Sequence, residues 1–243
     1  MKWISLLTIL SFALIAGCER DETTAAPPAD QVTSEAMPVT TAPAKPRTAQ
    51  GPRIVFLGDS LTAGLGLDAD QAFPALLATM LAEEHLPVHV VNAGVSGDTT
   101  AGGLRRLDWL LQQDPDIVVV GLGANDGLRG VELKASEENL RAIVRKSRDA
   151  GAHVLLLGML IPPNYGPEYT TQFRELYQRI ATDMSVPLVP FILQGVGGEA
   201  SLNQADGIHP TADGQRIVAR NILPHLRPIV KAHSQPATGP AAR

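Results

Sequence analysis

Five short apolar runs recur through residues 52–230, and a stretch with helical periodicity follows each of them. The runs cover residues 53–57, 88–92, 117–122, 154–158 and, more weakly, 187–191. They are continuously apolar rather than alternating, which is typical of parallel strands covered on both faces. The stretches with helical spacing cover residues 71–85, 99–113, 134–150, 168–185 and 211–229.

The first helical stretch illustrates the pattern. Its apolar side chains recur on one helix face, at Leu76, Leu77, Met80 and Leu81. Pro74 stands in the first turn of this stretch, where its missing N–H costs little. Alternation of strands and helices with short links predicts an α/β fold, a three-layer α/β/α sandwich around a five-stranded parallel sheet. Ligands of such sheets bind at the carboxyl ends of the strands.

The N-terminal residues have the pattern of an export signal. Lys2 precedes an apolar run over residues 3–16, which is too short for a membrane-spanning helix but fits a signal peptide. The run leads into LIAGC at residues 14–18, which resembles a bacterial lipobox, whose cysteine is lipidated and becomes the mature N-terminus. We therefore expect a lipoprotein signal peptide over residues 1–17 and a lipid on Cys18. The alternative is an ordinary secretory signal, with Cys18 an incidental thiol.

The composition on either side of the predicted domain is unlike that of the domain. Residues 18–51 are rich in Ala, Thr and Pro and carry few large apolar side chains. Such a segment buries too little to offset its chain entropy, so we expect a disordered tether there and a disordered tail over residues 231–243. Glu19 follows the cysteine in place of the aspartate associated with inner-membrane retention. We therefore expect an outer-membrane anchor on the periplasmic face.

Composition and charge exclude several classes of function. The 243 residues are 44% hydrophobic and 19% charged, with a net charge of −5 and no Lys/Arg cluster, which argues against a nucleic-acid partner. A single cysteine excludes an intramolecular disulfide and a multi-cysteine zinc site. The chain also has no HExxH sequence, no complete GxGxxG after the first strand and no P-loop lysine. We therefore expect neither a metal nor a cofactor, and the sequence does not predict the oligomeric state.

Four polar, glycine-rich segments follow predicted strands or precede the last helix, so the fold brings them to one edge of the sheet. They are GDSL at 58–61, NAGVSGDT at 92–99, GLGANDG at 121–127 and DGIHP at 206–210. Taken singly, each is more typical of a turn or a helix cap than of a site. Four such segments at one edge are much harder to explain as turns.

These segments contain the groups that acyl transfer requires. Ser60 is the candidate nucleophile, His209 the candidate base, and Asp206 the carboxylate that orients His209. The candidate oxyanion donors are the backbone N–H groups of Ser60 and Gly97 and the side-chain amide of Asn125. We expect the other histidines to be structural or exposed.

Together the segments resemble those of the SGNH hydrolases, also called the GDSL esterase/lipase family, whose four letters correspond here to Ser60, Gly97, Asn125 and His209. The resemblance covers residues 52–230. It is stronger for the secreted acyl-CoA thioesterases, arylesterases and lysophospholipases, through SGDT at 96–99, GANDGLRG at 123–130 and PNYG at 163–166.

The resemblance implies a flavodoxin-like sheet, serine chemistry without a metal, and an acyl groove near the loop that carries Asn164 and Tyr165. These two residues are therefore the candidate substrate-binding residues. Ala124 stands where the family often has glycine, and Leu65 and Gly66 replace an aromatic residue often found after the first segment. The second departure bears on acyl or aryl preference, and neither touches the predicted catalytic residues.

We therefore expect a serine esterase that hydrolyses small acyl esters or thioesters and meets the membrane through its lipid anchor. One alternative is a periplasmic carbohydrate or peptidoglycan O-deacetylase, which would use the same site. Another is a catalytically silent binding lipoprotein. The apolar residues 159–163 favour an acyl chain weakly, because they also continue a buried strand.

Overall fold

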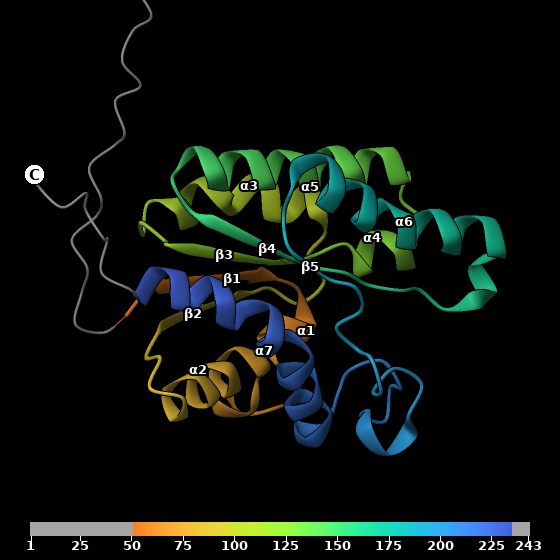
Figure 1. The fold of residues 1–243 in the computed structure, drawn as a ribbon. Helices are drawn as coiled ribbons and strands as arrows, with labels where there is room; N and C mark the ends of the chain where they lie inside the picture. Colours follow the sequence, from red (N-terminus) through yellow and green to blue (C-terminus); the bar gives the residue numbers. More distant parts are fainter. Residues whose placement is uncertain (1–50, 235–243) are drawn as a thin grey trace, which may run out of the picture. The chain divides into compact units, whose positions relative to one another are not determined.

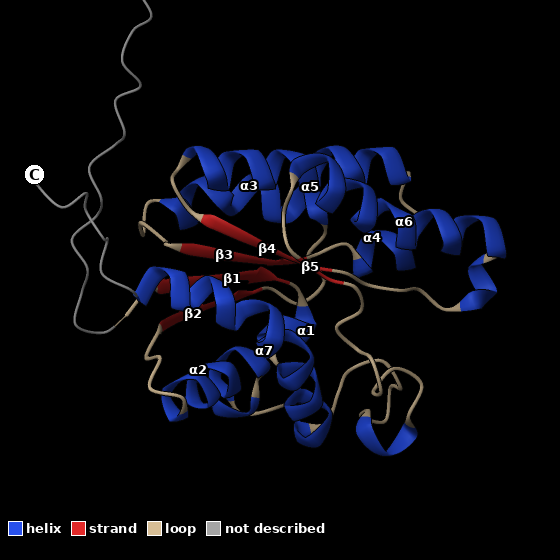
Figure 2. Cartoon of the chain, in the orientation of Figure 1, coloured by secondary structure: helices blue, strands red, loops and turns tan. Residues whose placement is uncertain are grey.

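A five-stranded parallel sheet forms the middle layer of the computed structural model, which describes residues 51–234 (Figures 1 and 2). The strands are β1 (Arg53–Gly58), β2 (His89–Gly94), β3 (Ile117–Gly121), β4 (His153–Leu157) and β5 (Leu188–Val189). They lie in the order β2-β1-β3-β4-β5, and every neighbouring pair is parallel. The predicted number of strands and their parallel direction are confirmed.

Long helices cover both faces of this sheet (Figure 1). On one face lie α3 (Thr100–Leu111), α5 (Leu133–Asp149) and α6 (Pro167–Met184), and on the other α2 (Phe73–Glu83) and α7 (Ala212–Ser234). The predicted three-layer α/β/α sandwich is therefore confirmed. In the part of the chain that is described, no helix is long and apolar enough to cross a membrane.

Several predicted boundaries differ from the structure. Helix α7 continues to Ser234, so the prediction of a disordered tail is wrong for residues 231–234. The fifth strand is shorter than the predicted 187–191, because Pro187 and Pro190 flank it and supply no N–H to a ladder. The predicted signal peptide, Cys18, the tether up to residue 50 and the tail from residue 235 lie outside the described residues.

Single-turn elements were not predicted, because one turn is too short to show a hydrophobic period. They are the helices α1 (Ser60–Ala63) and α4 (Ala124–Leu128) and the 3-10 turns η1 (Ala69–Gln71), η2 (Pro163–Tyr165) and η3 (Ala200–Leu202). Both short α-helices begin directly after a strand, at the carboxyl edge of the sheet. They carry Ser60 and Asn125, two of the predicted site residues.

The core lies on both sides of the sheet, and β1, β3 and β4 are mostly buried, as their continuous apolar runs predicted. The same prediction is wrong for β2, whose residues are all exposed or partly buried because β2 lies at the edge of the sheet. On one face the ring of Phe56 in β1 meets that of Phe73 in α2 edge-on, with centroids 5.8 Å apart. On the other face Phe173 and Tyr177 of α6 pack edge-on at 5.6 Å. Each fully buried side chain of this size contributes about 1.5–3 kcal/mol through burial. This core holds the strand ends, and so the site, in place.

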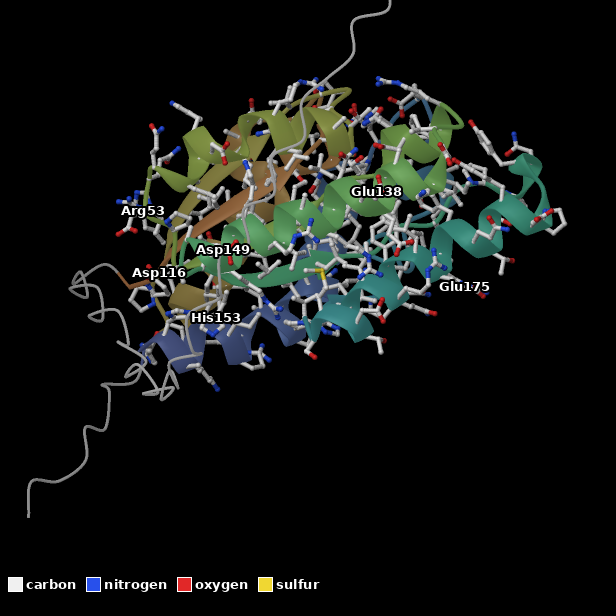
Figure 3. All side chains as sticks on the ribbon, turned by 90° about the horizontal axis from the view of Figure 1, so that it is seen from above. Arg53, Asp116, Glu138, Asp149, His153 and Glu175 are labelled. Atoms are coloured by element: carbon white, nitrogen blue, oxygen red, sulfur yellow. The ribbon has the colours of Figure 1, made fainter. Side chains whose placement is uncertain are left out.

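The edge where the strands begin is joined through Asp116. Its side-chain Oδ2 accepts a hydrogen bond from the amide of Arg53 at 2.8 Å, and its carbonyl accepts one from the amide of His153, also at 2.8 Å. Figure 3 shows these three residues together at one end of the sheet. The chain therefore enters the domain at the edge opposite the predicted site.

At the other edge, three glycines stand side by side. Gly58, which ends β1, is in register with Gly94 at the end of β2 and with Gly121 at the end of β3. A Cβ on Gly94 would lie 2.3 Å from the backbone nitrogen of Ala63, and one on Gly58 would lie 1.9 Å from Thr62 Oγ1. Helix α1 therefore sits on a row of strand ends that have no side chains.

We expect Gly94→Ala to destabilise the domain by about 1–3 kcal/mol, because the added methyl group forces α1 away from the sheet. Urea unfolding followed by circular dichroism measures the change. Gly197→Ala is the matched control, since a Cβ there first meets the Phe191 ring, at 3.3 Å. Equal stability of the two variants would contradict this account of the glycine row.

Candidate active site

Ser60 is the first residue of α1, one residue beyond the end of the buried strand β1. Asp59 is the N-cap of this helix, and its Oδ1 accepts a hydrogen bond from the amide of Leu61 at 3.0 Å. Gly64 adopts a left-handed conformation and ends the helix after a single turn. The hydroxyl of Ser60 is therefore held at the carboxyl edge of the sheet by a short, capped helix.

The structure brings Ser60, His209 and Asp206 into one hydrogen-bonded chain. His209 Nε2 lies 2.8 Å from Ser60 Oγ, and His209 Nδ1 lies 2.7 Å from Asp206 Oδ2. With the Nδ1 proton donated to the carboxylate, Nε2 is free to accept the proton of the serine hydroxyl. A serine 149 positions before its histidine in the sequence thus meets it at hydrogen-bond distance.

Asp206 is held in its ionised form. The amides of His209 and Ile208 both donate to Asp206 Oδ1 at 3.0 Å, and the imidazole donates to the other oxygen. These hydrogen bonds, that of the His209 amide first, lower the pKa of Asp206 to about 2. The carboxylate therefore stays charged wherever His209 can act as a base.

The loop that carries His209 is fastened to the serine side of the site by Gln204. Its Nε2 donates to the carbonyl of Leu65 at 2.7 Å, just beyond α1, and to that of Pro210 at 3.0 Å. Buried Asn203 donates to the carbonyls of Val196 and Glu199, at 2.7 and 2.8 Å. Sequence reasoning missed both residues, because each acts on backbone carbonyls and leaves no periodic signal.

The three predicted oxyanion donors lie on three neighbouring strand ends. Ser60 follows β1, Gly97 lies in the loop after β2, with φ of +78°, and Asn125 is the second residue of α4, which follows β3. The amides of Ser60 and Gly97 donate to no protein acceptor within residues 51–234. Asn125 Nδ2 donates to the carbonyl of Asp98 at 3.0 Å and approaches Asp59 Oδ2 at 3.4 Å. The free amides and the amide side chain are the kind of groups that stabilise a negative oxygen.

Asp59 is a buried carboxyl beside the nucleophile, and only 2% of it is exposed. Desolvation raises its pKa from 3.8 to about 6, against the hydrogen bond from the Leu61 amide and the attraction of His209, while Asp98 adds repulsion. The site thus contains two carboxyls, Asp59 and Asp206, whose pKa values are shifted in opposite directions. The sequence showed Asp59 only as part of the GDSL segment, with no role assigned.

The predicted substrate-binding residues lie on η2. Asn164 is exposed, and Tyr165 is partly buried. The Tyr165 hydroxyl donates to the carbonyl of Leu128 at 2.8 Å, which joins η2 to the end of α4. Substrate binding by these two residues stays a prediction, and the structure adds that Tyr165 also braces the segment that follows Asn125.

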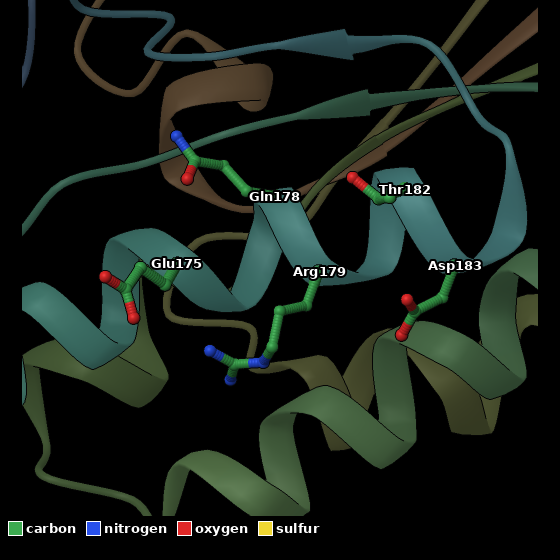
Figure 4. A pocket seen from close by; sticks show the side chains of 5 residues that line it. All are labelled: Glu175, Gln178, Arg179, Thr182 and Asp183. Atoms are coloured by element: carbon green, nitrogen blue, oxygen red, sulfur yellow. The ribbon is translucent and has the colours of Figure 1, made fainter.

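A surface hollow on α6 contains none of the predicted site residues (Figure 4). It is lined by exposed, mostly polar side chains, Glu175, Gln178, Arg179, Thr182 and Asp183. Arg179 is engaged in an ion pair with Glu137 at 2.8 Å. Within residues 51–234, no three His, Cys, Asp or Glu side chains are placed to share a metal ion.

A serine, an imidazole and a carboxylate joined in this way at the edge of a parallel sheet are the arrangement of a serine hydrolase. The chain belongs to the GDSL-like lipase/acylhydrolase family, whose family model matches residues 56–217. It is therefore an enzyme that hydrolyses ester bonds, as the resemblance of its four segments to the SGNH hydrolases implied.

Individual relatives agree with this assignment. The chain is 47% identical over 178 residues to "Esterase TesA" of Pseudomonas aeruginosa, covering 73% of this chain and 89% of the relative. It is 40% identical over 189 residues to "Thioesterase 1/protease 1/lysophospholipase L1" of Escherichia coli K12, covering 77% and 89%. A crystal structure of TesA superposes with a TM-score of 0.71 at 47% identity, over 73% of this chain and 99% of that one.

We expect Asp59→Asn to change the pH dependence of stability. In the native protein the pKa of Asp59 is raised from 3.8 to about 6, so the folded state binds the proton more tightly than the unfolded state. Stability is therefore lost as the pH rises from about 4 to about 6, by up to about 3 kcal/mol.

An asparagine at position 59 can still accept the hydrogen bond from the Leu61 amide. It has no ionisable carboxyl, so the variant should not lose this stability as the pH rises. The free energy of unfolding, measured in urea at several pH values, should rise for the variant relative to the native protein over that window. Asp70→Asn, at an exposed position, is the control. A difference between native protein and Asp59→Asn that does not change with pH would contradict the burial argument.

Proposed function

We propose that the protein is an exported serine esterase that hydrolyses acyl esters or thioesters through an acyl-enzyme on Ser60. The single observation that carries this mechanism is the chain of contacts Ser60–His209–Asp206, with distances of 2.8 and 2.7 Å. His209 takes the hydroxyl proton as Ser60 attacks the carbonyl carbon, and Asp206 stabilises the imidazolium. His209 then gives the proton to the leaving alcohol or thiol, and water releases the acyl group by the same steps.

The proposed oxyanion hole consists of the amides of Ser60 and Gly97 and the side chain of Asn125. This proposal is supported by the backbone amides of Ser60 and Gly97, which have no acceptor in the described part of the chain. The third donor is fixed in direction by its hydrogen bond to the Asp98 carbonyl, at 3.0 Å. Removing one donor of this kind typically lowers kcat about 10²- to 10³-fold.

Exposed apolar side chains around the site favour a fatty acyl or aryl group over an acetyl group. They lie on separate segments at the carboxyl edge, four in loops and Leu128 at the end of α4: Leu65, Val95, Leu128, Leu160 and Ile208. Ile208 precedes the proposed base, and Val95 lies two positions before Gly97. We call these five residues the apolar rim. The names of the relatives, an esterase, an arylesterase and a thioesterase/lysophospholipase, agree with such substrates.

We also propose that the protein is lipid-anchored through Cys18, on the periplasmic face of the outer membrane. The lipobox-like residues 14–18 support this anchor, and Glu19 supports the choice of membrane. The described domain is compatible with it, because β1 begins at Arg53, at the edge opposite Ser60.

We expect Ser60→Ala to abolish hydrolysis, by more than about 10⁴-fold in kcat, because the variant has no nucleophile. The assay is release of p-nitrophenol from esters with acyl groups from acetyl to palmitoyl. Ser147→Ala, which removes another buried hydroxyl in α5, is the matched control and should keep full activity. Undiminished turnover by Ser60→Ala would exclude the mechanism.

The same series of esters distinguishes the acyl groups. An optimum at medium or long chains supports the esterase proposal. A sharp preference for acetyl would favour a carbohydrate or peptidoglycan O-deacetylase instead.

Cys18→Ser tests the anchor. We expect the native protein to incorporate radiolabelled palmitate in a bacterial host and to fractionate with membranes. The variant should lose both properties, because only a thiol accepts the diacylglyceryl group. Labelling that persists in Cys18→Ser would exclude lipidation at this position, and a native protein without label would indicate an ordinary secretory signal.

A further inference from the structure

Arg106 reaches from α3 to the carboxyl edge of the sheet and donates through all three guanidinium nitrogens. Nε lies 2.7 Å from Asp98 Oδ2, Nη1 lies 2.7 Å from the carbonyl of Ala93, and Nη2 lies 2.9 Å from that of Gly58. The side chain is largely enclosed, with 23% of it exposed, against 11% for that of Asp98. One cation therefore joins the ends of β1 and β2 to the loop that follows β2.

Each of these contacts leads to a proposed oxyanion donor. Gly58 lies two residues before Ser60, and Ala93 is the penultimate residue of β2, which leads into the loop that carries Gly97. Asp98 follows Gly97 directly, and its carbonyl accepts the hydrogen bond from Asn125 Nδ2 at 3.0 Å. The guanidinium thus contacts the segments that set the positions of all three donors.

The carboxylate of Asp98 has little freedom to move. Its second oxygen, Oδ1, accepts a hydrogen bond from the amide of Thr99 at 3.0 Å. A Cβ on Gly102 would lie only 1.6 Å from the same oxygen, so the carboxylate fills the space that this glycine leaves in the first turn of α3. Arg106 and Asp98 therefore fix the loop against a helix that is itself packed on the sheet.

We propose that Arg106 is a positioning residue for the oxyanion hole. It holds the amides of Ser60 and Gly97 and the side chain of Asn125 at the spacing that the transition-state oxygen requires, while making no contact with the substrate. This inference rests on the proposed roles of those three donors. A planar guanidinium suits the task, because it donates in three fixed directions, whereas the ammonium of lysine is a point charge on a flexible stem.

Without Arg106, stabilisation of the transition state should weaken while binding of the substrate stays the same. Donors that have moved by a fraction of an ångström still allow the substrate to bind, but they stabilise the oxyanion less. Removal of Arg106 should therefore lower kcat and leave KM nearly unchanged. A residue that only braces the fold would instead lower the melting temperature and leave kcat of the folded enzyme intact.

The test compares Arg106→Ala, Arg106→Gln and Arg106→Lys in the full-length protein with p-nitrophenyl esters. We expect kcat to fall about 10- to 100-fold in all three, with KM within about threefold of the native value. Labelling of Ser60 by a fluorophosphonate, which forms a tetrahedral adduct in the same hole, should slow in proportion to kcat/KM. Millimolar guanidinium should partly restore Arg106→Ala, because it can occupy the vacated site.

Two further variants are the controls. Arg227→Ala removes an arginine that is bonded to Glu84 through two nitrogens at 2.6 Å, far from Ser60 in the fold, and should keep native kcat. Asn125→Ala removes a donor directly and should lose activity without recovery by guanidinium.

The outcomes distinguish a failure of the positioning role of Arg106 from a failure of the proposed mechanism. Native kcat in the Arg106 variants, or a rise in KM alone, overturns the positioning role. Where Arg106→Ala does not fold, Arg106→Gln and Arg106→Lys give the same kcat and KM comparison. Activity retained by Ser60→Ala overturns the proposed mechanism, and activity retained by Asn125→Ala overturns the oxyanion assignment, whatever Arg106 does.

Discussion

The close seat of α1 on the glycine ends of β1, β2 and β3 is the constraint on which the rest of the site depends. Because Gly58, Gly94 and Gly121 lie in register and have no side chains, a helix can begin immediately beyond β1 and still contact the sheet. Ser60 then stands at the start of that helix, with its hydroxyl directed at His209 and its amide without an acceptor among residues 51–234. A longer connection would leave the same serine on a loop with no fixed direction.

The two carboxyls of the site show how burial and hydrogen bonding shift the pKa of the same chemical group in opposite directions. Asp206 is exposed and accepts three hydrogen bonds, so its pKa is lowered to about 2 and it is charged at neutral pH. Asp59 is almost fully buried, and desolvation raises its pKa to about 6. Burial of Asp59 costs stability near neutral pH, and its cap on Leu61 offsets part of that cost while fixing α1.

Much of this arrangement could be predicted from the sequence, because its signals are local. Continuous apolar runs marked the strands, and helical periodicity marked the long helices. The segments of Ser60, Gly97, Asn125 and His209 pointed to a site only together, through their convergence at one edge of the sheet and their resemblance to the SGNH hydrolases. The pattern could not show side chains that form hydrogen bonds with backbone atoms far away in the sequence. Arg106 binds a carbonyl 48 positions away, and Gln204 binds one 139 positions away. The single-turn helices and the short strand β5, which prolines flank, could not be predicted either, because a hydrophobic period becomes visible only over several residues.

The apolar rim has a consequence for how such an enzyme changes over evolutionary time. Its five side chains are exposed and come from five separate segments of the chain. Leu65 and Ile208 take part in the hydrogen bonds of the site only through backbone atoms, which a change of side chain leaves in place. Replacement of an exposed side chain usually changes stability by less than about 0.5 kcal/mol. Each rim position is therefore free to vary by itself, and new substrate preferences can accumulate in single steps while the reaction stays the same.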